Sequence, residues 1–183
     1  MDRNKALALL TTHVPDKHLV SHCIATAAIM KALAPHLSGN PDEWERIGIL
    51  HDIDYTETGE DMQRHGIVAY DLLVGQGLPE PVARIIRNHN HVLFGGTYVE
   101  PVEIALQAAD SASGLIIACA LVKQGNLSDV SVSTIRKKFK EKSFAAGCDR
   151  DRIRLIEKFM SLEEFYGICL NGLLPVKTEL GLT

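Results

Sequence analysis

Histidines and aspartates inside apolar helical segments are the residues of this chain best suited to chemistry. His51 and Asp52 directly follow an apolar run, His22 falls on the apolar face of an earlier helical segment, and Asp110 lies within the most apolar stretch of the sequence. A buried imidazole or carboxylate is costly unless it finds a partner. Imidazole and carboxylate together are the usual ligands of divalent metal ions. We therefore expect these side chains to converge on a metal ion.

Each of these residues also has a simpler interpretation when it is taken alone. A single histidine on an apolar helix face is more often a hydrogen-bonded core residue than a metal ligand. Asp110 is harder to explain in this way, because aspartate is a poor residue in the middle of a helix and a buried carboxylate needs compensation. The metal hypothesis thus rests on the combination of residues and not on any one of them.

The segments that must position these residues have helical periodicity, and we predict an all-α fold. A capping Asn40 followed by Pro41 marks one strong helix start. Helices are expected over about 4–12, 15–35, 41–52, 65–74, 79–89, 101–123, 135–142 and 149–160, with a last one opened by Ser161. Loops are expected at 56–62 and 90–98, where polar residues and glycines gather.

The length of 183 residues fits a single domain over 1–183. We place a metal-binding core at about 14–123 and a helical C-terminal extension at about 127–183, with the boundary at Gln124–Asn126. The extension contains a basic helix around Arg136–Lys142, which is typical of an exposed amphipathic face.

Composition excludes several classes of function. Nineteen Lys and Arg against 23 Asp and Glu give a net charge of −4, so neither nucleic acid nor a membrane is expected as a partner. The N-terminus lacks the features of a secretory signal. The four cysteines show no short pairing and are interpreted as reduced thiols, which indicates a cytoplasmic protein. Whether the chain forms a homo-oligomer is left open.

The order His22, His51-Asp52, Asp110 resembles the ligand signature of the HD superfamily of metal-dependent phosphohydrolases, and Leu50-His51-Asp52-Ile53-Asp54-Tyr55 is similar to its core motif. The resemblance implies a compact multi-helix bundle that holds one or two divalent ions, which are Mn, Fe, Ni, Co, Zn or Mg. It implies that Asp52 bridges two ions, with His22, His51 and Asp110 on one and His65 and His89 on the other. For His65 and His89 the alternatives are hydrogen bonding to substrate or loop exposure, and His91 is a less well matched candidate.

The family resemblance predicts hydrolysis of a nucleotide or small phosphorylated metabolite by a metal-activated water. Asp52 would act in catalysis at the metal, and Asp54 or Glu57 could accept the proton of that water. Arg87 or an unliganded His65 could neutralise the charge of the phosphate. Arg84 is a further phosphate-binding candidate, although a solvated face explains it as well.

The sequence departs from the family's motifs at two places, which reduces the range of activities that the resemblance implies. Two alternative functions stay open. Tyr55 stands where mononuclear nucleotidases of the family have a glutamate, and no GYP motif follows His89, so neither a simple nucleotidase nor a cyclic-dinucleotide phosphodiesterase is indicated. The alternatives are a di-iron oxygenase of the same superfamily and a non-catalytic domain that binds metal or nucleotide.

Overall fold

The computed structural model describes residues 1–59 and 61–183, and this part of the chain contains helices and no strand. It confirms the all-α prediction. The helices are α1 (Arg3–His13), α2 (Lys17–Leu33), α3 (Pro41–Leu50), α4 (Tyr55–Thr58), α5 (Ile67–Gly75), α6 (Glu80–Asn88), α7 (His91–Phe94), α8 (Pro101–Leu121), α9 (Val132–Lys140), α10 (Arg150–Arg154) and α11 (Leu162–Leu173). Short 3-10 turns follow α2, α8, α10 and α11 at Ala34–Leu37, Leu127–Asp129, Leu155–Lys158 and Leu174–Val176.

Polar caps explain where many of these helices begin. A side-chain oxygen that accepts a hydrogen bond from a backbone N–H of the first turn satisfies a donor that has no partner within the helix. Asn40 caps α3 in this way through the N–H of Glu43, as its sequence predicts. The other side chains that cap α-helices are Asp2, Asp16, Asn90, Ser131, Asp149 and Ser161.

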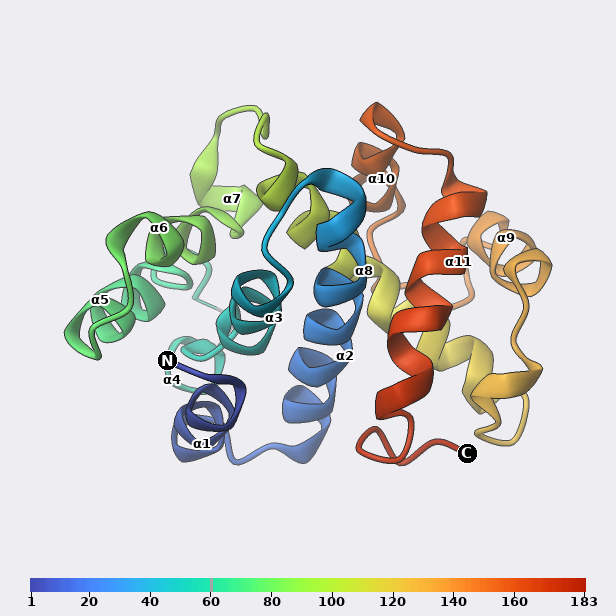
Figure 1. Ribbon diagram of the computed structural model, residues 1–183, viewed down its shortest axis with the longest axis horizontal. Helices are drawn as coiled ribbons and strands as arrows, with labels where there is room; N and C mark the ends of the chain where they lie inside the picture. Colours follow the sequence, from blue (N-terminus) through green and yellow to red (C-terminus); the bar gives the residue numbers. More distant parts are fainter. Residues whose placement is uncertain (60) are drawn as a thin grey trace.

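Helix α2 lies at the centre of the fold and packs against α3, α8 and α11 (Figure 1). Glycine makes two of these approaches possible. A Cβ atom at Gly48 of α3 would lie 2.4 Å from the Cα of Ala27, and one at Gly172 of α11 would lie 2.7 Å from the carbonyl oxygen of Ala28. Helices α5, α6 and α7 gather at one end of the molecule, and α9, α10 and α11 lie at the other (Figure 1).

Three details differ from the sequence-based expectations. The predicted loops at 56–62, of which residue 60 lies outside the described residues, and at 90–98 overlap short helical turns, α4 and α7. Asn90 caps α7 through the N–H of Val92. The helix predicted over 149–160 is divided into α10 and a 3-10 turn. Helices of the C-terminal segment pack on the core, since α10 contacts α8 and α11 contacts α2.

Helix α8 is the one helix in the described residues that is long and apolar enough to cross a membrane. In the fold, 72% of its most apolar window is buried inside the protein. Burial of this kind is typical of the central helix of a folded core.

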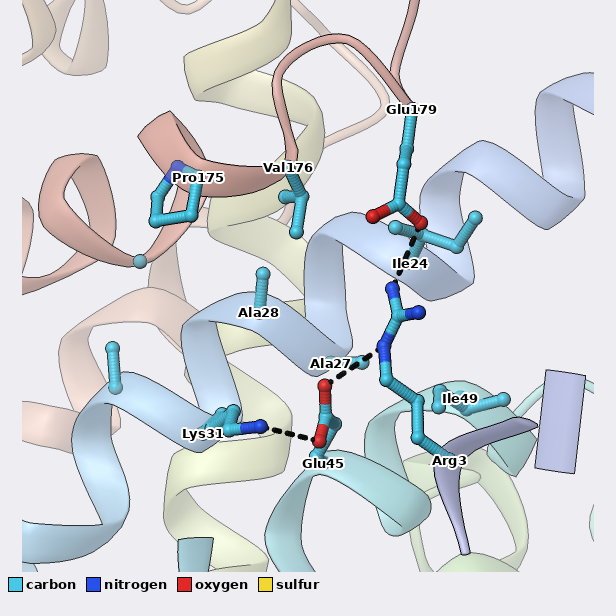
Figure 2. A pocket seen from close by; sticks show the side chains of 12 residues that line it. Arg3, Ile24, Ala27, Ala28, Lys31, Glu45, Ile49, Pro175, Val176 and Glu179 are labelled. Atoms are coloured by element: carbon cyan, nitrogen blue, oxygen red, sulfur yellow. Dashed lines mark hydrogen bonds and ion pairs between the residues drawn. The ribbon is translucent and has the colours of Figure 1, made fainter. Parts of the chain in front are cut away.

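A cleft of about 420 Å³ lies on the surface of α2, between α3 and the segment after α11 (Figure 2). Its walls are mainly apolar, and ion pairs cross one side of it. The Glu45 carboxylate accepts from Arg3 Nε at 3.1 Å and from Lys31 Nζ at 2.8 Å, and Arg3 Nη2 lies 2.8 Å from a Glu179 oxygen. This network ties the first helix to the C-terminal turn, and it is distinct from the histidine and aspartate cluster.

Candidate metal centre

The six predicted ligands meet at one place, although they come from five separate parts of the chain. His22 projects from α2 and Asp110 from the middle of α8. His51 and His89 are the residues that end α3 and α6, and His65 precedes α5 by two residues. Helix ends and a central helix thus deliver polar side chains to the interior, where His51, His65 and His89 are at most 4% exposed.

Asp52 stands between two pairs of histidines. Its Oδ1 atom lies 3.2 Å from His89 Nε2 and 3.4 Å from His65 Nε2. Its Oδ2 atom lies 3.4 Å from His51 Nε2 and 3.7 Å from His22 Nε2. Each oxygen of this carboxylate therefore faces one histidine pair, which is the arrangement of a bridging ligand.

Asp110 adds a second carboxylate to one of the two pairs. Its Oδ1 atom lies 3.1 Å from His22 Nε2 and 3.8 Å from His51 Nε2. The residues thus divide into one group of His22, His51, Asp52 and Asp110 and another of Asp52, His65 and His89. The division matches the one that the sequence resemblance implies.

In each of the four histidines of the cluster, the ring nitrogen that faces away from Asp52 is Nδ1, and it has a hydrogen-bond acceptor. The Nδ1–H groups of His51 and His89 donate to the carbonyl oxygens of Gly48 and Ile86, at 2.9 and 2.5 Å. His65 Nδ1–H donates to Asp54 at 2.9 Å. His22 Nδ1 lies 3.2 Å from Ser113 Oγ, which gives its own proton to a carbonyl oxygen.

These hydrogen bonds fix the ring orientation, so each neutral imidazole presents an unprotonated Nε2 to the cluster. The Nε2 atoms of His22 and His51 are 3.3 Å apart, and those of His65 and His89 are 3.1 Å apart. Metal–ligand distances of about 2.0–2.2 Å place two neighbouring ligands of one ion about 3.0–3.5 Å apart. The donor set and its spacing therefore fit a divalent ion in each group.

The pKa values of the cluster residues also favour binding of a cation. Burial raises the pKa of Asp52, but the neighbouring His51, His65 and His89 outweigh it and hold the pKa well below its usual range. The pKa of Asp110 is also low, because the charge of Arg152 and the hydrogen bond to His22 outweigh burial. Burial lowers the pKa of His51 to about 4. At neutral pH the cluster thus offers anionic oxygens and a neutral imidazole, the states that bind a cation.

Metal binding at His65 is expected to strengthen as the pH rises from 6 towards 9. Burial lowers the pKa of His65, but hydrogen bonds to Asp52 and Asp54 outweigh it and raise the pKa to about 9. The metal-free side chain is protonated at pH 7, so an ion must displace a proton, and the apparent affinity should rise about tenfold per pH unit. Calorimetric Mn²⁺ titrations in buffers of different ionisation enthalpy measure the protons released. Equal affinity at pH 6 and pH 8 would contradict this prediction.

Asp54 does not take the role of proton acceptor predicted for it. Its side chain is fully buried, and both oxygens are occupied: Oδ1 by His65 Nδ1, and Oδ2 by the N–H groups of Gly66 at 2.7 Å and Ala69 at 3.0 Å. Three of its roughly four acceptor sites are therefore used, and the side chain neither has exposed surface nor lines the pocket at the cluster, where it could meet a water. Asp54 instead orients His65 from the side opposite the cluster, as the carboxylate partner of a ligating histidine does.

Asp54→Asn is therefore expected to weaken Mn²⁺ binding about 10- to 100-fold, the range for losing such a partner. The amide keeps the size of the side chain but removes the charge that aligns His65. Calorimetric Mn²⁺ titration measures the effect, and Asp71→Asn on the exposed surface of α5 serves as the control. Unchanged Mn²⁺ affinity would show that Asp54 does not orient a ligand.

Glu57, Arg84 and Arg87 do not reach the cluster, which corrects the roles predicted for them. Glu57 is exposed and pairs with Arg64 at 3.0 Å, and Arg84 is exposed and lies 3.7 Å from Glu80. Arg87 extends over the ring of Tyr70. None of the three lines the pocket at the cluster. Their helices direct these side chains to solvent, which sequence spacing alone did not reveal.

Arg152 is the main site residue that the sequence analysis missed. It projects from α10, and its Nη2 atom lies 2.6 Å from Asp110 Oδ2. Its sequence surroundings, Asp149–Arg154, are charged and give no local sign of a buried role. Ser113, the acceptor for His22, was missed as well, although its place one turn after Asp110 on an apolar helix was a usable signal.

The fold and the cluster together define an all-helical protein with a candidate two-ion centre of histidine and aspartate. The family model for the HD domain matches residues 19–115, which is more than half of the chain and includes all six candidate ligands. The chain belongs to the HD-domain family, whose general activity is metal-dependent phosphohydrolysis. No curated protein and no solved structure matches the chain significantly.

Proposed function

We propose that this protein is a metal-dependent phosphohydrolase that acts on a nucleotide or a small phosphorylated metabolite. The observation that carries the proposal is the Asp52 carboxylate between two histidine pairs, with all four Nε2 atoms directed at it. His22, His51, Asp52 and Asp110 would hold one ion, and Asp52, His65 and His89 would hold a second. A bound divalent ion supplies Lewis acidity towards a phosphoryl oxygen and lowers the pKa of a coordinated water.

The chain's own residues shape where a substrate would lie. A pocket of about 320 Å³ opens at the cluster, with Asp52, His65, His89 and Asp110 in its lining. Its other walls come from Leu19, Tyr55, Met62, Asn90, His91 and Arg152. The volume is at the lower end of the range for ligand pockets, which supports a small substrate. The mixture of apolar walls with one arginine fits an anionic group joined to a small organic part.

The proposal is tested with protein loaded in turn with Mn, Fe, Co, Ni, Zn and Mg and assayed for phosphate release from a panel of phosphate esters. We expect activity with at least one ion, and loss of that activity in Asp110→Ala. Arg84→Gln, on the exposed surface of α6, is the control that should keep full activity. A ligand that raises the melting temperature without turnover would instead support a binding domain.

The two groups that share Asp52 also favour a second candidate function. The superfamily resemblance includes di-iron oxygenases with six ligands of these types, and the structure brings six such residues together. Two iron ions per chain after purification without added metal, together with substrate-dependent oxygen consumption, would support this alternative. Phosphate release without oxygen consumption would exclude it in favour of hydrolysis.

A further inference from the structure

We propose that Arg152, carried by the C-terminal segment, binds the phosphoryl group of the substrate in the pocket at the histidine and aspartate cluster. This inference rests on the proposed hydrolase function and names the residue that recognises the substrate's charge. Arg152 lies outside residues 19–115, so the family match does not assign it a role.

The guanidinium group of Arg152 is held firmly at the edge of the cluster. Its Nε–H donates to Gln107 Oε1 at 2.7 Å, and Nη2 donates to Asp110 Oδ2 at 2.6 Å. Gln107 is fully buried, and its own Nε2 donates to the carbonyl oxygen of His89 at 2.9 Å. Asp110, a candidate metal ligand, thus fixes one side of the guanidinium group, and the amide of Gln107, itself held by a hydrogen bond, fixes the other.

These two bonds use only part of the guanidinium group. Arginine carries five N–H donors, and two of them have partners here. Within residues 1–59 and 61–183, the remaining three donors make no hydrogen bond. The side chain is 16% exposed and lines the pocket at the cluster. Arg152 therefore has donors available for a ligand in this pocket.

Charge indicates what those donors would bind. Arg152 is the one lysine or arginine among the described residues that line this pocket. A phosphoryl group that approached the carboxylates of Asp52 and Asp110 would be repelled by them, and Arg152 would offset that repulsion together with the metal ions. The planar fork of arginine suits phosphate oxygens, and such charge-assisted bonds are strong.

Asp110 can pair with this arginine and still serve as a candidate metal ligand. The carboxylate divides its oxygens, with Oδ2 towards Arg152 and Oδ1 towards His22 Nε2 at 3.1 Å. The bond to Arg152 thus leaves Oδ1 directed at the histidine pair. Arg152 can orient Asp110 and contact substrate at the same time, so a test must separate the two roles.

The test measures calorimetrically the binding of Mn²⁺, and then of inorganic phosphate at saturating Mn²⁺, to the full-length protein. In Arg152→Gln we expect phosphate affinity to fall about 10- to 100-fold, because charge-assisted hydrogen bonds are lost. Arg152→Lys keeps the charge but not the fork, and an intermediate loss is expected. Arg154→Gln is the matched control, since Arg154 is exposed and pairs with Glu157, and it should bind phosphate normally.

Phosphate affinity that is the same in wild type and Arg152→Gln at saturating Mn²⁺ would overturn the inference, and so would wild-type protein that binds Mn²⁺ but no phosphate. Neither result would by itself reject hydrolysis, which the ester panel tests separately. Wild-type protein that binds no divalent ion would reject the proposed function itself. Thermal melting of each variant verifies that it is folded, and the lysine variant keeps the test decisive should the glutamine variant unfold.

Discussion

Asp52→Asn is expected to remove metal binding from both groups at once. Losing a partner of a ligand costs about 10- to 100-fold in affinity, and losing a ligand shared by two ions should cost more than 100-fold. The amide is nearly the same size as the carboxylate, so the fold should persist. Metal analysis after dialysis against Mn²⁺ is expected to fall from one or two ions per chain in wild type to less than a tenth of that value.

The control for this substitution is Asp71→Asn, which removes one carboxylate from the exposed surface of α5. Both variants change the net charge of the protein equally, so a general charge effect would appear in both. If Asp52→Asn retained wild-type metal content, the bridging role of Asp52 would be wrong, and with it the two-ion arrangement.

Gly48→Ala is expected to destabilise the fold by about 1–3 kcal/mol and to weaken metal binding as well. The new Cβ atom would lie 2.4 Å from Ala27 Cα and 2.7 Å from Ala27 N, and these backbone atoms cannot rotate away. Overpacking costs about 1–3 kcal/mol and occasionally more, and approaches this close to backbone atoms place the cost at the upper end, above the gain of up to about 1 kcal/mol from better helix propensity. Moving α3 away from α2 would also separate His51 from His22, whose Nε2 atoms are 3.3 Å apart.

Gly167→Ala in α11 provides the matched control, since a Cβ at that position would meet no heavy atom of the described residues within 4 Å beyond its own helical turn. The same substitution should there stabilise the protein by up to about 1 kcal/mol through helix propensity. Urea unfolding of the metal-free variants measures the stability, and Mn²⁺ titration measures the site. Equal stability of the two variants would mean that α2 and α3 can shift apart at little cost.

Most helices could be predicted because local chemistry determines them. Asn40 and Pro41 specify the start of α3, and the apolar stretch around Asp110 predicts the buried α8. The convergence of His22, His51-Asp52 and Asp110 followed from the cost of burying polar groups in apolar surroundings, joined with the order of the motif. The helix starts and the apolar stretch are signals that a single segment carries, whereas the convergence was predicted from several segments taken together.

The residues that were misplaced depend on contacts between segments. Asp54 looked like a free carboxylate, and only the fold shows that the N–H groups of Gly66 and Ala69 occupy one of its oxygens. Arg87 and Arg152 both lie in polar sequence, yet one extends over a tyrosine ring and the other enters the pocket. Such differences arise from how helices are rotated and docked, which short-range patterns do not encode.

The position of Arg152 late in the chain has a consequence for biosynthesis. It follows Asp110 by 42 residues, which a ribosome adds in about 2–8 s at 5–20 residues per second. All six candidate ligands therefore emerge before the arginine that neutralises Asp110. If the N-terminal helices pack during that interval, Asp110 is buried without its arginine partner, and a bound cation would then offset the missing charge.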